Sequence, residues 1–148
     1  MDDLARRALC RVALLPLGAL ALPQGSIVAD TDPARPLKVY IFADMEGISG
    51  ISHAGQTLSG GADYQEGCRL MAEDINACVD GCFAAGATEV VVRDGHGGGT
   101  NVEPDRIDPR ARLIHGPTPA ARFKDLDGSA ALILLGYHAM ALTPGAIF

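Results

Sequence analysis

The stretch Leu-Lys-Val-Tyr-Ile-Phe-Ala at residues 37–43 is rich in β-branched and aromatic residues, and it is too apolar for a strand that faces water. A second apolar run, Glu-Val-Val-Val-Arg, occupies residues 89–93. Between them, residues 63–85 have the period of an amphipathic helix, and Gly86 is well placed to end it. A buried strand, a helix and a second buried strand predict an α/β fold with a mostly parallel sheet.

Two more strands complete the expected sheet. The stretch Ala-Ala-Leu-Ile-Leu-Leu-Gly-Tyr at residues 130–137 is apolar throughout, and residues 112–115 favour a short strand. Residues 44–61 are rich in glycine and serine, which favours a loop. Strands this apolar predict a sheet with helices on both faces, in a Rossmann-like three-layer arrangement. We expect one domain over residues 30–148.

The composition limits the partners that the chain is expected to bind. Its 148 residues include 12 lysines and arginines against 18 aspartates and glutamates, which gives a net charge of −6. This balance argues against a surface that binds nucleic acid phosphates. Aromatic residues make up only 5%, so stacking on bases or sugar rings is not expected to be the main activity.

Residues 1–29 have the layout of a secretory signal. Three arginines precede residue 12, residues 12–22 carry no charge, and Ala29 is a small residue suited to cleavage. An apolar stretch of 11 residues is too short to span a bilayer, which takes about 20, so we expect no membrane anchor. We predict an exported protein, periplasmic or secreted. The alternative is an N-terminal extension on a cytoplasmic protein.

Three of the four cysteines, Cys68, Cys78 and Cys82, fall on the apolar stripe of the expected helix, and Cys10 belongs to the leader. An odd number at irregular spacing does not indicate a disulfide framework. We interpret the three as small core residues rather than as metal ligands or redox groups.

Two acids and two histidines follow directly after expected strands. Asp44 and Glu46 come after the first strand, His96 after the second, and His138 after the strand at 130–137. Because the carboxyl ends of parallel strands meet at one edge of a sheet, we expect the four side chains to gather there. Neighbouring carboxylates need a cation, and this mixture of oxygen and nitrogen ligands suits zinc or a similar divalent ion. The sequence therefore predicts a metal centre.

Each part of this pattern has a simpler explanation when it is taken alone. Carboxylates spaced like Asp44 and Glu46 often cap a turn, and a single histidine after a strand is often structural. The coincidence of all four at one edge is what favours a metal. Asp94, two residues before His96, could orient that imidazole or could cap the loop that follows it.

Charge also limits the number of ions. Asp44 and Glu46 together balance one divalent ion. A second ion would need a bridging hydroxide and a further acid, and no obvious candidate for that acid lies between His138 and Phe148.

The segment Asp-Met-Glu-Gly-Ile-Ser-Gly at residues 44–50 resembles the signature of the DppA-type D-aminopeptidases, a family of zinc metallopeptidases. The resemblance continues through the long helix, through Glu-Val-Val-Val-Arg-Asp-Gly-His at residues 89–96, and through Asn101. It ends with Leu-Gly-Tyr-His-Ala at residues 135–139 and Thr-Pro-Gly at residues 143–145. The Asp-Met-Glu-Gly and Gly-Tyr-His-Ala segments are specific when they occur together.

The resemblance implies an aminopeptidase that binds two zinc ions and releases N-terminal D-amino acids, such as D-alanine, from short peptides. By position, Asp44 would be shared by both ions and Glu46 would bind one of them. His96 and His138 would supply the nitrogen ligands. The ions would polarise the peptide carbonyl and activate water. Family members are similar in forming large ring-like homo-oligomers.

Two features of the family fall outside this sequence. Its catalytic histidine and a further glutamate ligand would lie just past Phe148, so we expect the chain to be the amino-terminal half of a longer enzyme. The α/β domain would then be incomplete at its C-terminus, without a catalytic residue of its own. We expect such a chain to bind metal weakly and to hydrolyse little or nothing. The alternatives are another metal-dependent amide or ester hydrolase, or a metal-binding remnant without turnover.

Overall fold

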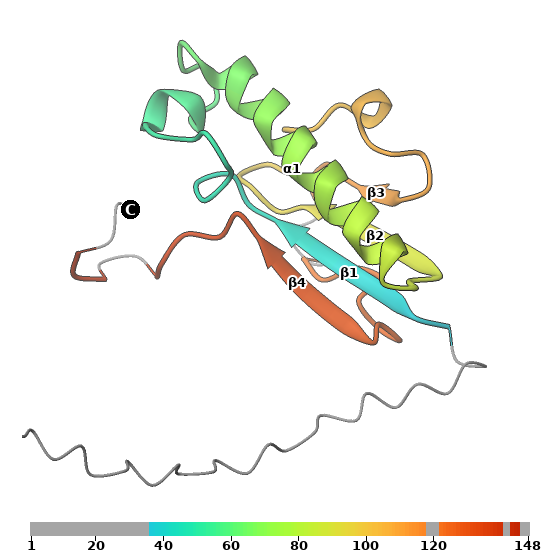
Figure 1. The fold of residues 1–148 in the computed structure, drawn as a ribbon. Helices are drawn as coiled ribbons and strands as arrows, with labels where there is room; N and C mark the ends of the chain where they lie inside the picture. Colours follow the sequence, from blue (N-terminus) through green and yellow to red (C-terminus); the bar gives the residue numbers. More distant parts are fainter. Residues whose placement is uncertain (1–35, 118–121, 141–142, 146–148) are drawn as a thin grey trace, which may run out of the picture. The chain divides into compact units, whose positions relative to one another are not determined.

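The apolar stretch that opens the domain forms the centre of a parallel sheet. A computed structural model describes residues 36–117, 122–140 and 143–145. In it, β1 (Lys38–Ala43) lies between β2 (Glu89–Asp94) and β4 (Ala131–Leu135), and β3 (Arg112–Ile114) pairs with β2. The order is β3-β2-β1-β4 and every pair is parallel (Figure 1). The predicted α/β class and parallel sheet are therefore confirmed.

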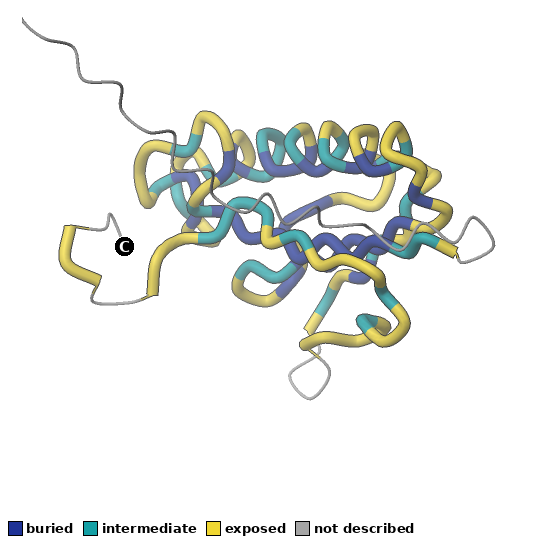
Figure 2. Tube along the Cα trace, turned by 60° about the horizontal axis from the view of Figure 1, so that its bottom comes forward, coloured by how far each residue is buried: buried dark blue, intermediate teal, exposed yellow. Residues whose placement is uncertain are grey.

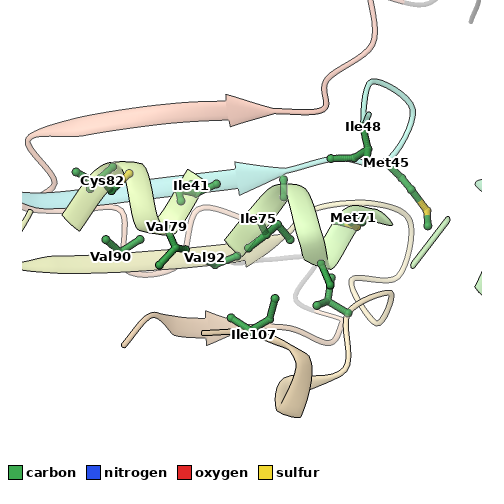
Figure 3. Packing of buried hydrophobic residues seen from close by; sticks show 14 of the residues in the cluster. Ile41, Met45, Ile48, Met71, Ile75, Val79, Cys82, Val90, Val92 and Ile107 are labelled. Carbon is green, nitrogen blue, oxygen red and sulfur yellow. The ribbon is translucent and has the colours of Figure 1, made fainter. Parts of the chain in front are cut away.

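The predicted helix is α1 (Tyr64–Ala84), which lies along one face of the sheet (Figure 1). Its buried side chains pack on alternate residues of β1 and β2, and Figure 3 shows Met71, Ile75 and Val79 in this layer. The helix stops where Gly86 takes a φ of +94°, a left-handed conformation that glycine adopts at little cost. This interface between helix and sheet is the main core of the described residues.

The opposite face of the sheet holds a second, smaller apolar cluster. Tyr40 and Phe42 of β1 point to this side, and the Phe42 ring lies 5.2 Å from the ring of Phe123. We predicted helices on both faces. In the described part of the chain, residues 122–130, which precede β4, lie on this face instead (Figure 2). The two short 3-10 helices, η1 (Ala54–Gln56) and η2 (Pro104–Arg106), belong to loops.

Strand β4 is more exposed than its sequence suggests. We predicted a buried strand over residues 130–137, but β4 is shorter and, among the described strands, lies at the edge of the sheet. The exposed fractions of Leu132 and Leu134 are 45% and 57% (Figure 2 shows burial along the chain). An apolar composition predicts a strand, but the position of the strand in the sheet decides how far water reaches it.

The structure describes the three helix cysteines but not the expected leader. Cys82 is buried in the core, Cys68 and Cys78 are half-buried against it, and all three are free thiols, as their interpretation as core residues requires. The expected leader, residues 1–29, lies outside the described residues. Among the residues that the structure describes, no helix is long and apolar enough to cross a membrane.

The strand order reverses between β1 and β4. From β1 the chain moves through β2 to β3 on one side, and then returns to place β4 on the other side of β1. In sheets of this kind, ligands bind where the strand order reverses. Ala43 lies opposite both Asp94 and Leu135, so β1, β2 and β4 end at the same level.

We predict that Ile75→Ala strongly destabilises the fold. Ile75 is fully buried between α1 and the sheet, so the substitution leaves a cavity and should lower the free energy of unfolding by about 2–5 kcal/mol in a urea titration. Leu134→Ala on exposed β4 is the control and should cost only about 0.5 kcal/mol. Equal losses in the two variants would contradict the location of the core.

Candidate metal centre

Asp44 and Glu46 lie on the segment that leaves β1, and this segment stays bound to the one that leaves β4. The Asp44 N–H donates to the Leu135 carbonyl oxygen at 2.8 Å, and the Gly47 N–H donates to that of Gly136 at 2.7 Å. Glycine is required at both contacts. A Cβ on Gly136 would lie 2.4 Å from the Asp44 carbonyl oxygen, and one on Gly47 would lie 2.9 Å from the Gly136 backbone. These contacts bring the residues after both strands together.

His96 lies between the two carboxylates. Its Nδ1 is 3.1 Å from Asp44 Oδ1 and 3.2 Å from Glu46 Oε2. Its Nε2 is 2.9 Å from the carbonyl oxygen of Thr57. A carbonyl oxygen can only accept, so Nε2 carries a proton. Nδ1 faces the two carboxylates and donates to them when the ring is doubly protonated. The ring is therefore oriented by one backbone group and two carboxylates.

The local electrostatics favour positive charge at this position. The hydrogen bond with Asp44, helped by the Thr57 carbonyl and the charge of Glu46, raises the pKa of His96 to about 9, although burial opposes the shift. Burial by itself would raise the pKa of the Asp44 carboxyl, but hydrogen bonds from His96 and the Met45 N–H hold that pKa below its usual value. The negative charge of Asp44 is thus retained in a largely buried site.

His138 approaches the same carboxylate from the β4 side. Its Nε2 lies 3.7 Å from Asp44 Oδ2, so the two imidazoles face different oxygens of Asp44. One ligand atom from each of Asp44, Glu46 and His138 lies within 4.8 Å of the others. The structure thus brings together all four residues that we predicted as ligands, with Asp44 in contact with both histidines. His138 is the most open, with 38% of its side chain exposed.

Asp94 bonds to the loop after β2 and not to the His96 ring, so our prediction of it as a residue that supports a ligand from behind is wrong for the imidazole. Its fully buried carboxylate accepts from the N–H of Asn101 at 2.6 Å, from Asn101 Nδ2 at 2.8 Å and from the N–H of Val102 at 3.2 Å. Asn101 Nδ2 also donates to the carbonyl oxygen of His96. Asp94 therefore caps the loop that carries His96, which was the second of the two roles considered for it.

The group that orients the imidazole is the Thr57 carbonyl, which the sequence analysis did not identify. It is a backbone atom in a loop, and no side-chain pattern marks it. The available signal was two glycines: Gly61 lets the loop approach its own backbone at Gly55, and Gly67 lets α1 approach Gln56.

Comparisons with known proteins assign the chain to a family. The family model for D-aminopeptidases matches residues 37–148, a range that contains all four candidate ligands. The chain belongs to the D-aminopeptidase family. A curated relative, the D-aminopeptidase of Bacillus subtilis (strain 168), is 39% identical over 111 residues. That match covers 74% of this chain and 40% of the relative.

A solved structure from the family has the same fold. It is described as the Zn-dependent D-aminopeptidase DppA from Bacillus subtilis, a self-compartmentalizing protease. It matches with a TM-score of 0.70 and 38% identity, over 73% of this chain and 40% of that one. This chain therefore spans about 40% of the length of the D-aminopeptidases that it matches.

We predict that Asp94→Asn destabilises the fold of this D-aminopeptidase family member. The substitution replaces one carboxylate oxygen by an NH₂ group. This group would face N–H groups of the loop, which need an acceptor, so the free energy of unfolding should fall by about 1–3 kcal/mol in urea. Asp105→Asn, in exposed η2 on the same connection, should change it by about 0.5 kcal/mol or less. If Asp94→Asn were as stable as the wild type, the capping role would be wrong.

Proposed function

We propose that this chain binds zinc through Asp44, Glu46, His96 and His138, and that the centre serves an aminopeptidase acting on short peptides with an N-terminal D-residue, such as D-alanyl dipeptides. The observation that carries the proposal is the position of Asp44, whose two oxygens face two different imidazoles. Glu46 also contacts one of these imidazoles, at Nδ1 of His96. Two carboxylates with two imidazoles form a donor set of the kind that zinc prefers.

The residues of the chain have separate tasks in this proposal. When bound, zinc supplies Lewis-acid polarisation of the peptide carbonyl and activation of water. Asp44, with an oxygen toward each imidazole, would hold the zinc ion and, if a second ion were bound, would be shared with it. Glu46 adds the second negative charge. His96 is held on its far side by Thr57, and His138, being half-exposed, lies on the side open to solvent and so to a peptide.

The number of zinc ions that we propose for the chain rests on the balance between their charge and that of the carboxylates. Within residues 36–117, 122–140 and 143–145, no third carboxylate joins Asp44 and Glu46 in the cluster. Two carboxylates balance one divalent ion, whereas two ions require a further acid. We therefore propose that the 148-residue chain binds about one zinc ion, weakly, and that its hydrolysis of D-alanyl-D-alanine is slight or absent.

We further propose that the protein forms a homo-oligomer and that it is exported. The Bacillus subtilis structure is of a protein described as self-compartmentalizing, which supports a homo-oligomer for the present protein. The leader layout of residues 1–29 supports export. Light scattering of the purified protein tests whether it forms an oligomer. Sequencing the N-terminus of protein recovered from outside the cytoplasm tests whether it is exported.

Zinc binding to the wild type and two histidine variants tests the site. In a competition assay with a chromogenic chelator, we expect about one ion per wild-type chain. His138→Ala should lower the affinity at least tenfold, because it removes a nitrogen ligand while leaving the fold intact by circular dichroism. His115→Ala, an exposed histidine after β3, is the matched control and should bind as the wild type does.

The same samples are assayed for hydrolysis of D-alanyl-D-alanine and L-alanyl-L-alanine. We expect any turnover to be confined to the D-peptide and to be lost in His138→Ala. Unchanged zinc affinity in His138→Ala would contradict the site. Rapid cleavage of D-alanyl-D-alanine by the 148-residue chain would contradict the proposal that it is nearly inactive, and cleavage of the L-peptide alone would contradict the substrate class.

A further inference from the structure

The turn η1 leads into Thr57, which contacts the ring nitrogen of His96 that faces away from Asp44 and Glu46. Thr57 directly follows η1 and is almost fully buried, and its carbonyl oxygen accepts the Nε2–H of His96 at 2.9 Å. This contact keeps a proton on Nε2. It leaves Nδ1 as the atom that faces Asp44 and Glu46. The position of the Thr57 carbonyl therefore determines how His96 is presented to an ion.

The side chain of Gln56 ties η1 to the loop that precedes it. Gln56 is buried, and its Oε1 accepts from the N–H groups of Ser52 at 2.8 Å and His53 at 3.3 Å. Its Nε2 donates to the carbonyl oxygen of Gly50 at 3.2 Å. One amide side chain thus satisfies three backbone groups and holds the turn in one conformation.

Helix α1 supports η1 from the other side through Gly67. A Cβ on Gly67 would lie 2.1 Å from the Gln56 carbonyl oxygen and 3.0 Å from Met45 Cε. A backbone oxygen cannot yield as the end of a flexible side chain can, so only glycine allows the helix to approach this closely. The Gln56 carbonyl lies one residue before Thr57. A displacement of η1 at Gly67 would therefore move the acceptor of His96.

We propose that η1, held by Gln56 and Gly67, is a positioning element that keeps His96 with Nε2–H on the Thr57 carbonyl and Nδ1 toward the metal. This inference rests on the proposed function, because it assigns the ligand atom of the same centre. A second hydrogen bond on the far nitrogen orients a ligating imidazole and makes it a better ligand. Loss of such a partner typically lowers metal affinity by roughly 10- to 100-fold.

Two alanine substitutions in α1 test the proposal with the full 148-residue chain. Gly67→Ala forces the Gln56 carbonyl away from the helix. Gly81→Ala is the matched control, because a Cβ there meets nothing within 4 Å. The readouts are zinc affinity by chelator competition and the long-range proton–nitrogen NMR spectrum of the His96 ring, which reports the Nε2–H proton and its protection from exchange with water.

We expect a protected Nε2–H signal from His96 in the wild type and in Gly81→Ala, with equal zinc affinity. In Gly67→Ala the signal should be lost or should exchange rapidly, and zinc affinity should fall roughly 10- to 100-fold. A folded Gly67→Ala with an unchanged ring spectrum and unchanged affinity would overturn the proposal. If Gly67→Ala does not fold, Gln56→Ala takes its place, with a fall in affinity and faster Nε2–H exchange expected and no change in either overturning the proposal.

The ring spectrum also separates this proposal from the proposed function. If the wild type binds no zinc but retains the protected Nε2–H signal, the metal centre is wrong and the contact with Thr57 stands. If the wild type binds zinc with Nε2 unprotonated, the metal centre stands and the positioning role of η1 is overturned.

Discussion

The carboxylate of Asp44 is held away from water at the end of the central strand, and the surrounding structure is arranged to stabilise its charge. Burying an ionised carboxylate is costly unless hydrogen bonds and opposite charge compensate. The Met45 N–H and His96 supply the hydrogen bonds, and His138 lies close to the second oxygen. Glu46 adds another negative charge on the same side. A site with this balance favours a cation.

The meeting of these residues depends on the backbone beyond the strands. Parallel strands β1 and β4 end at the same level, but chains usually diverge once a sheet ends. Here the hydrogen bonds from Asp44 to Leu135 and from Gly47 to Gly136 keep the two segments together as far as Gly47 and Gly136. The family match covers the whole segment that contains these residues.

The sequence predicted much of this arrangement, and the reasons for its failures are physical. Apolar strands at residues 37–43 and 89–93 and the stripe of the helix between them determine local structure directly, so the polar residues that follow the strands could be placed at one edge. The exposure of Leu134 could not be predicted, because it depends on which strand ends the sheet. Asp94 and Thr57 show a related limit. The partners of a buried carboxylate and the direction of a backbone carbonyl are set by loop conformation, which residue types alone do not specify.

The central claim is that a metal ion lies beside Asp44, and anomalous diffraction at the zinc absorption edge locates it most directly. Crystals of the 148-residue chain grown with zinc should show a peak at bonding distance from an Asp44 oxygen and from Nδ1 of His96. Without a peak beside Asp44, or with a peak bound only by residues elsewhere on the surface, the account of this site would be contradicted.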